Sequence, residues 1–299
     1  MKKYKVYQID SFTDKKFTGN PAGVVLDAEG LTEAQMLSIA REMNNSETAF
    51  IFETPTQDYD VEVRFFTPVA EVPICGHATV ASHYVRAMEK GLENCRVVQK
   101  TKAGILPVDI EKTADGYNVT MTQGEIKIHT PFDAQTVENI AQALGITVQD
   151  IRSDCPVTIA STGFGKVMVA IKSDEMLQSL KPDMSKLVEI SKRINCNGYY
   201  VFTIGENRKD LVHGRMFAPI SGINEDPVTG NANGPLGAYL VHYGIVPNDG
   251  KYLEFSIEQG RAMGRCGNMT VMVDIAEGKP TLAKIKGGAV AAFCAEIEL

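Results

Sequence analysis

The pattern of hydrophobic and polar positions alternates between strand-like and helix-like segments from the first residues onward. Residues 4–10 alternate apolar and polar side chains, which is typical of a β-strand with one buried face. Apolar residues then recur at helical spacing over 36–43, behind Thr32-x-x-Gln35, which resembles a capping box. The pattern therefore predicts an opening strand and, after it, a helix over 32–44.

The same criteria predict the remaining elements. Further strands are expected at 24–26, 49–52, 60–66, 96–110, 117–121, 156–160, 166–171, 198–203, 212–217, most of 252–275, and 289–298. Further helices are expected at 77–90, 134–144, 184–194 and 231–243, and a turn is expected at Asn20-Pro21-Ala22-Gly23. The helices over 77–90 and 231–243 are apolar on most faces, which indicates that each is buried within a domain.

Several landmarks occur twice in the same order, about 150 residues apart. Arg64-Phe65-Phe66-Thr67-Pro68 leads to Cys75-Gly76-His77-Ala78-Thr79 and the first buried helix. Arg215-Met216-Phe217-Ala218-Pro219 leads to Thr229-Gly230-Asn231-Ala232-Asn233-Gly234 and the second. A Gln-x-x-x-x-Gly motif follows each helix. We infer two related halves, with a ligand site expected where they meet, because sites favour domain interfaces.

These predictions define an α+β fold of two pseudo-symmetric domains, each a curled, mostly antiparallel sheet wrapped around a central buried helix. The N-terminal domain is expected to comprise residues 1–127 together with 287–299, since the last strand can return to the first sheet. The C-terminal domain is expected to comprise residues 128–286, after a polar linker near 122–132.

Composition narrows the class of protein. The 299 residues carry a net charge of −7 with scattered Lys and Arg, which argues against a nucleic-acid partner. No apolar run approaches the roughly 18 residues of a membrane span, so no membrane partner is expected. The six cysteines include no Cys-x-x-Cys pair, which favours reduced thiols over disulfides or zinc binding. We expect a soluble, cytoplasmic protein.

Both buried helices begin at a glycine, Gly76 in the first half and Gly230 in the second. The first amides of a helix lack partners within it, and its dipole makes that end electropositive. Two such ends at one cleft would clamp a carboxylate. A Walker motif is excluded because Pro235-Leu236 follows the last glycine of the second loop, so a nucleotide is not expected.

Four side chains near these loops are candidates for chemistry. Glu47 lies at a corner between a predicted helix and strand, where side chains commonly point into a site. His77 suits hydrogen bonding or proton transfer at the first helix, and it cannot chelate a metal with His83, which lies on another face. Cys75 is either a buried thiol or a reactive one, and Asp226 either caps its turn or joins the site. No metal is expected.

Five motifs that span most of the chain resemble the phenazine-biosynthesis PhzF family. They are Asn20-Pro21-Ala22-Gly23, Asn45-Ser46-Glu47-Thr48-Ala49-Phe50, Arg64-x-Phe-x-Pro68, Cys75-Gly76-His77-Ala78-Thr79 and Glu225-Asp226-Pro227-Val228-Thr229-Gly230. The resemblance implies the diaminopimelate epimerase fold, with the active site between two domains. It also implies a homodimeric isomerase without cofactor or metal, similar to trans-2,3-dihydro-3-hydroxyanthranilate isomerase, which shifts a proton on its substrate.

The resemblance also implies roles for individual residues. Glu47 matches the general acid/base, and His77 and Asp226 match the other catalytic residues. The amides of Gly76 and Gly230 match those that hold a substrate carboxylate.

Three further residues, Asn20, Cys75 and Asn231, complete the expected substrate-binding set. Asn231 stands where the family pattern has serine, which bears on substrate choice rather than on reaction class.

Two alternatives remain open. An amino-acid racemase or epimerase of this fold would use two opposed cysteines, but Thr229 stands where the partner of Cys75 would be, and a hydroxyl is a far weaker acid. A non-catalytic metabolite-binding protein would have no need of the set formed by Glu47, His77 and Asp226.

Overall fold

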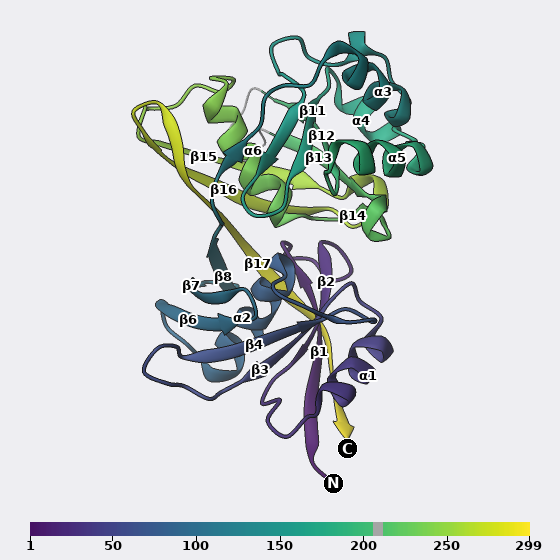
Figure 1. Cartoon of the computed structure of the whole chain (residues 1–299). Helices are drawn as coiled ribbons and strands as arrows, with labels where there is room; N and C mark the ends of the chain where they lie inside the picture. The colour runs from purple at the N-terminus through teal and green to yellow at the C-terminus, as the bar shows by residue number, and fades with distance from the viewer. Residues whose placement is uncertain (206–211) are drawn as a thin grey trace. The chain divides into compact units, whose positions relative to one another are not determined.

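The computed structural model describes residues 1–205 and 212–299 (Figure 1). The chain forms two compact units. Unit 1 comprises Met1–Thr122 and Lys286–Leu299, and unit 2 comprises Gln123–Ile285. Each unit has strands arranged around one buried helix, which confirms the predicted α+β class. No helix among the described residues is long and apolar enough to cross a bilayer.

Unit 1 contains two helices and most of its strands in the first 122 residues. Its elements are β1 (Lys3–Ser11), β2 (Asn20–Val25), α1 (Glu33–Met43), β3 (Thr48–Phe52), β4 (Val61–Phe66), β5 (Glu71–Val72), α2 (Gly76–Lys90), β6 (Cys95–Thr101), β7 (Gly104–Thr113), β8 (Gly116–Thr122) and the later part of β17 (Lys279–Glu298). Helix α1 has the predicted capping box at Thr32 and Gln35. Helix α2 is buried without a break from His77 to Val85.

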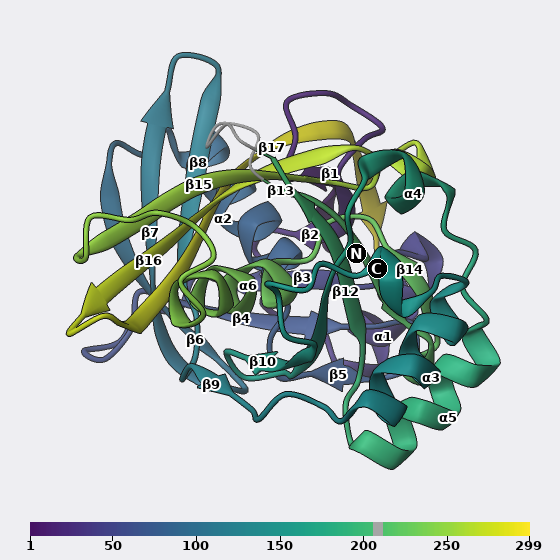
Figure 2. The same cartoon turned by 90° about the horizontal axis from the view of Figure 1, so that it is seen from above.

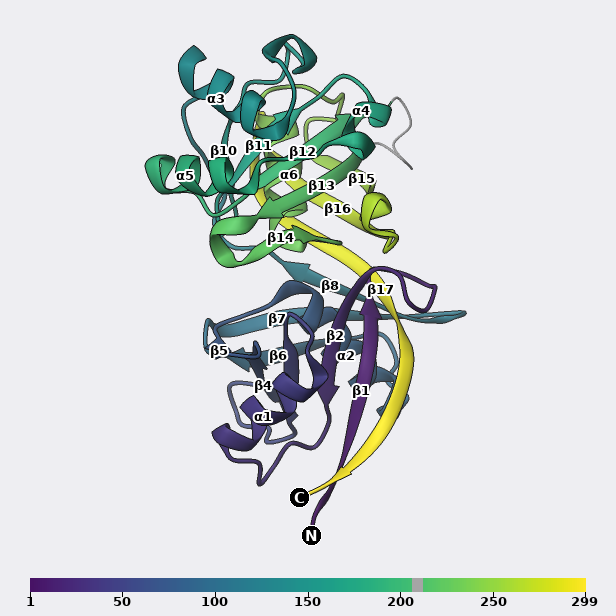
Figure 3. The same ribbon diagram turned by 90° about the vertical axis from the view of Figure 1, so that its right-hand side faces the viewer.

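The last strand returns to the first sheet, as the sequence predicted. In Figure 3, β1 lies between β2 and β17, and it pairs antiparallel with both. The two ends of the chain also meet, since the amide of Lys2 donates to the carbonyl of Leu299 at 2.8 Å.

Two local predictions in unit 1 are wrong. Asn20-Pro21-Ala22-Gly23 is the start of β2 and not a turn. Proline is tolerated there because β3 pairs with β2 only from Gly23 onward, so Pro21 lies where one edge of the strand is open. The segment 96–110 is not one strand but the hairpin of β6 and β7, which reverses between Thr101 and Gly104.

Unit 2 contains more helix. Its elements are β9 (Lys127–Ile128), α3 (Ala134–Leu144), β10 (Thr158–Ser161), β11 (Lys166–Ala170), α4 (Asp174–Ser179), α5 (Met184–Ile194), β12 (Tyr199–Ile204), β13 (Val212–Ala218), β14 (Ile223–Asp226), α6 (Gly230–His242), β15 (Tyr252–Gln259) and β16 (Gly267–Ala276). Helices α3 and α5 have the predicted bounds. Helix α4 and strand β14 were not predicted, and short β9 lies in the expected linker.

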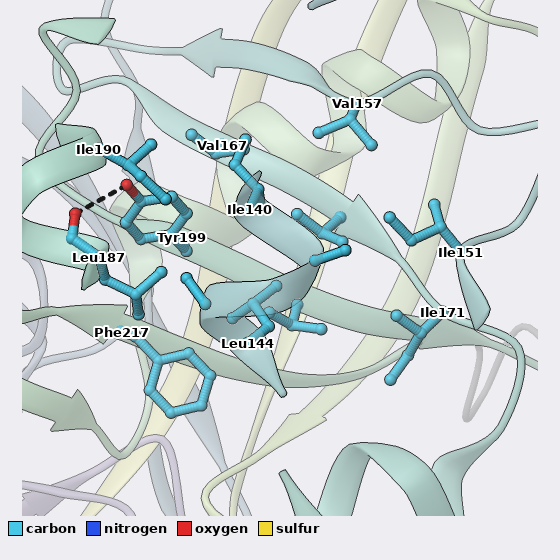
Figure 4. Packing of buried hydrophobic residues seen from close by; sticks show 14 of the residues in the cluster. Ile140, Leu144, Ile151, Val157, Val167, Ile171, Leu187, Ile190, Tyr199 and Phe217 are labelled. Atoms are coloured by element: carbon cyan, nitrogen blue, oxygen red, sulfur yellow. Dashed lines mark hydrogen bonds between the residues drawn. The ribbon is translucent and has the colours of Figure 1, made fainter. Parts of the chain in front are cut away.

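The sheet of unit 2 is covered on both faces. On one face, Leu144 of α3 and Leu187 of α5 pack in one apolar cluster with Tyr199 and Phe217 of the sheet (Figure 4). The Tyr199 hydroxyl donates to the Leu187 carbonyl at 2.9 Å, so this buried polar group is satisfied. On the inner face lies α6, which Figure 2 shows among the strands.

The sequence repeat corresponds to a repeat in strand pairing. Strand β4 pairs antiparallel with β5 and parallel with β6, and β13 pairs in the same way with β14 and β15. The repeated arginines have equivalent partners. Arg64 binds Glu71, and Arg215 binds Glu225. Each guanidinium also lies over the phenylalanine two residues later, at 5.2 and 5.0 Å. The two halves are therefore related in structure as well as in sequence.

Candidate functional site

The N-terminus of α2 is open at Gly76. Its N-cap residue, Cys75, makes no side-chain capping hydrogen bond. A side chain at Gly76 would meet no described atom within 4 Å beyond its chain neighbours and the backbone of α2. The first amides of the helix are thus not capped by a side chain of the N-cap residue, and an anion has room to approach them.

The corner that carries Glu47 is held in place by hydrogen bonds from two strands. Helix α1 ends at Met43, and its C-cap residue Asn44 takes the left-handed conformation with φ of 50°. The side-chain amides of Asn45 and Gln8 form two hydrogen bonds with each other, at 2.8 and 3.0 Å. The amide of Gly23 donates to the carbonyl of Glu47 at 3.2 Å. The backbone of Glu47 is therefore bonded to β2, and the side chain of nearby Asn45 is bonded to β1.

Glu47 and His77 are in contact. The Oε2 atom of Glu47 lies 3.4 Å from Nε2 of His77, and their side chains are 18% and 9% exposed. The hydroxyl of Ser46 lies 3.3 Å from the same ring nitrogen. Sγ of Cys75 lies 3.4 Å from Nδ1 and 3.9 Å from Nε2 of the same ring. This arrangement places a carboxylate with restricted access to solvent beside an imidazole.

Glu47, Cys75 and His77 form the one group, among the described residues, whose ligand atoms are close enough together to hold a metal ion. One ligand atom from each of Glu47, Cys75 and His77 lies within 4.8 Å of the other two. The electropositive end of α2 opposes a cation at this position. The donor set alone does not make this a metal centre.

Asn20 lies at the same end of α2. It is almost fully buried and is the cross-strand partner of Ser11, whose hydroxyl donates to the carbonyl of His77 at 2.8 Å. Unit 1 therefore brings together the five candidates that the sequence placed in it, namely Asn20, Glu47, Cys75, Gly76 and His77. Ser46 is an addition that the sequence analysis missed, although it adjoins Glu47.

In unit 2, the N-cap residue of α6 is Thr229, and its side chain makes no capping hydrogen bond to the helix. The hydroxyl of Thr229 donates instead to the carboxylate of Asp226. The side chain of Gln259 binds both residues: its Nε2 donates to the Asp226 carbonyl at 2.8 Å, and its Oε1 accepts from the Thr229 amide at 3.2 Å. Asp226 is thereby fixed beside Gly230, while Asn231 is exposed.

This network continues into the core of unit 2. Asn233 donates from Nδ2 to Oε1 of Gln259 at 3.0 Å and accepts at Oδ1 from the Tyr200 hydroxyl at 2.6 Å. All three side chains are buried. The sequence analysis gave none of them a role. The repeated Gln-x-x-x-x-Gly motif was the signal for Gln259.

The equivalent glutamine of unit 1 has a different partner. Gln99 contacts Nε2 of His83 through its Oε1 atom at 3.0 Å. His83 is fully buried, and this burial lowers its pKa to about 4. His83 is therefore a neutral core residue, and it lies away from the contact between Glu47 and His77.

Comparisons with known proteins agree across the whole chain. The family model described as phenazine biosynthesis-like protein matches residues 9–295. An uncharacterized isomerase of Clostridium acetobutylicum is 53% identical over 300 residues, covering 100% of this chain and 99% of the relative. The trans-2,3-dihydro-3-hydroxyanthranilate isomerase of Pseudomonas aeruginosa is 30% identical over 284 residues, 95% of each. A Bacillus anthracis phenazine biosynthesis protein of the PhzF family superposes with a TM-score of 0.89 at 33% identity, covering 100% of both chains.

Proposed function

Because the chain belongs to the phenazine biosynthesis-like family, whose relatives are named isomerases, we propose that it is a cofactor-independent isomerase. Its substrate is a small metabolite that carries a carboxylate, and the reaction moves one proton between two carbon atoms. The observation that carries this proposal is the contact between Glu47 and His77 beside the uncapped N-terminus of α2.

Glu47 is the general acid/base. Its carboxylate takes a proton from one carbon of the substrate, and the resulting carboxylic acid returns a proton to a second carbon as the double bond moves. One base suffices, since the proton leaves and arrives on the same face. His77, whose Nε2 atom lies 3.4 Å from the Glu47 carboxylate, orients that carboxylate. Atoms and charges balance without any oxidant, reductant or metal.

The substrate carboxylate binds to helix amides. In this proposal the N-terminal domain (1–127 with 287–299) contributes the amide of Gly76, and the C-terminal domain (128–286) contributes that of Gly230. The positive ends of two helix dipoles then stabilise the anion. Asp226 is the catalytic residue of the second domain. Asn20, Cys75 and Asn231 complete the binding site, and Asn231 affects which substrate is accepted.

A two-cysteine racemase has less support. The position that would hold the second thiol is Thr229, whose hydroxyl donates to the Asp226 carboxylate. A hydroxyl is too weak an acid to replace a thiol in such a reaction.

We also propose that the protein works as a homodimer, on the grounds of the family resemblance. We propose that it works in the cytoplasm, because its six cysteines form no disulfide.

The test is uptake of solvent deuterium into a panel of small unsaturated or cyclic carboxylates, followed by mass spectrometry. Glu47→Gln should slow exchange by about 10²- to 10⁴-fold, the usual contribution of a general acid/base. Glu42→Gln removes an exposed carboxylate from the neighbouring helix and should exchange at the wild-type rate. Equal exchange by Glu47→Gln and wild type would remove Glu47 from its role.

Cys75→Ser separates the two isomerase classes. A thiol-based racemase would lose its activity in this variant, whereas a reaction driven by Glu47 would continue. A ligand that stabilises the wild-type protein but undergoes no exchange would instead support a metabolite-binding protein.

A further inference from the structure

Lys166, the first residue of β11, is a buried lysine to which the mechanism above gives no role. It is only 3% exposed, and burial lowers the pKa of its amine to about 8. The amine donates to Oδ1 of Asn197 at 2.8 Å and lies 6.0 Å from the ring centre of Phe164. Among the described residues it forms no ion pair within 4 Å. Burying a cation is costly unless a charge compensates it, which is why the pKa of this amine falls.

The strand register shows where Lys166 points. Beside it lies Gly198, the residue before β12, whose carbonyl accepts from the Val167 amide at 2.9 Å. A Cβ atom on Gly198 would lie 3.2 Å from Cδ of Lys166 and would overlap the end of Met216. The Lys166 and Met216 side chains therefore meet over Gly198, in space that only a glycine leaves open.

Asp226 lies on this same face. It is the cross-strand partner of Met216 in β13 and β14, and directly opposed residues point to the same side of a sheet. This face of the sheet is the one that packs against α6. Tyr200 of β12 follows Gly198 by two residues, so it points to the same face, and its hydroxyl binds Asn233 of α6. Lys166 and Asp226 thus belong to one face of the sheet, near the beginning of α6.

Asp226 is a carboxylate on this face whose charge favours the Lys166 cation. The titratable groups on the segment beside Lys166 include Cys196, Tyr199 and Tyr200, and burial raises the pKa of each, so all three are neutral at pH 7. Cys196 and Asp226 both act to raise the pKa of Lys166, Cys196 more strongly, but the neutral thiol of Cys196 carries no charge at pH 7. Lys192 of α5 lines the adjoining cavity of about 480 Å³, but it is exposed to solvent.

We propose that Lys166 is a positioning residue for Asp226. Its side chain extends over Gly198, and its amine is held by Asn197. The positive charge of the amine keeps the Asp226 carboxylate ionised and directed at the N-terminus of α6. The electrostatic link stands by itself, and its importance for catalysis rests on the proposed function. An ionised Asp226 accepts the hydroxyl proton of Thr229, which leaves the first amides of α6 for the substrate. Neutralising Lys166 would favour the protonated acid and weaken this arrangement.

The first experiment needs no substrate. The Cε resonance of Lys166 is followed by NMR against pH in ¹³C-lysine-labelled protein and assigned with Lys166→Arg. Asp226→Asn should lower the Lys166 midpoint by about one pH unit, since an opposite charge nearby shifts a pKa by about that much or more. Glu189→Gln removes an exposed carboxylate of α5 and should leave the midpoint in place. An unchanged midpoint in Asp226→Asn would overturn the proposal.

The second experiment uses the deuterium exchange assay between pH 5 and 9. When the exchange rate is plotted against pH, the midpoint of the fall on the acidic side should lie about one pH unit higher in Lys166→Met than in wild type. Lys166→Arg should restore the wild-type midpoint. A purely structural role would lower the rate without moving the midpoint, and that outcome would also overturn the proposal. If no variant exchanges deuterium, the proposed function fails, while the NMR titration still decides the link between Lys166 and Asp226.

Discussion

The buried His83 makes the stability of unit 1 depend on pH. Its Nε2 atom contacts Oε1 of Gln99, and its Nδ1 atom has no hydrogen-bond partner among the described residues. A proton on Nδ1 would be a buried donor without an acceptor. Burial of the charge is the main reason that the pKa of His83 falls from the ordinary 6.5 to about 4, and the nearby Arg86 cation lowers it further.

The sign of the effect follows from proton binding. As pH falls below 6.5, the unfolded chain binds a proton at His83 that the folded chain does not bind until about pH 4. The stability that neutral His83 contributes is therefore present above pH 6.5 and is lost as pH falls toward 4. Between pH 7 and pH 5 this loss amounts to about 2 kcal/mol for these two pKa values.

The assay compares wild type with His83→Gln. Urea-dependent unfolding of unit 1 is followed by hydrogen exchange of α2 peptides at pH 7 and pH 5, where most carboxylates remain charged. Wild type should lose about 2 kcal/mol more than His83→Gln between these pH values. His129→Gln, which removes an exposed histidine, should behave as wild type. Equal pH sensitivity of wild type and His83→Gln would refute the reasoning.

Three further substitutions test the packing and capping described above. Glu225→Gln leaves the buried guanidinium of Arg215 without its charge partner and should cost about 3 kcal/mol in urea unfolding; a cost no larger than that of a surface substitution would contradict it. Gly214→Ala places a methyl group against the Tyr200 hydroxyl and should cost about 1–3 kcal/mol, read as a lower Tm by calorimetry. Thr32→Ala removes the N-cap of α1 and should cost about 1 kcal/mol by the same method, whereas Thr32→Ser should cost much less.

The sequence predicted best where a local signal marks both ends of an element. Helices α3 and α5 were predicted from apolar residues at helical spacing, and in the structure each begins after an aspartate N-cap and ends before a residue in the left-handed conformation. The repeat was also visible in the sequence. Arg64 and Arg215 each lie over a phenylalanine two residues later and each bind a glutamate further on, so the same residue types recur in both halves.

The failures have physical causes. Helix α4 has six residues and β14 has four, which is too short for a hydrophobic period to be recognised. Asn20-Pro21-Ala22-Gly23 has the composition of a turn, but its conformation is set by pairing with β1, a contact that local sequence does not encode.

The candidate site was predictable only in part for a similar reason. Gly76 and Gly230 follow from the start of an apolar helix, and Glu47 follows from a corner between elements. The links from Gln259 to Asn233 and from Lys166 to Asn197 join segments about 30 residues apart, so no motif announces them. Buried polar networks of this kind become visible only when the strands are placed side by side.

The most direct test of the central claim is a crystal structure of the protein with a small carboxylate ligand that it binds. The account predicts that the carboxylate oxygens lie within about 3 Å of the backbone amides of both Gly76 and Gly230, with the side chain of Glu47 turned toward the ligand. A carboxylate bound at only one of these helix ends, or at neither, would contradict it.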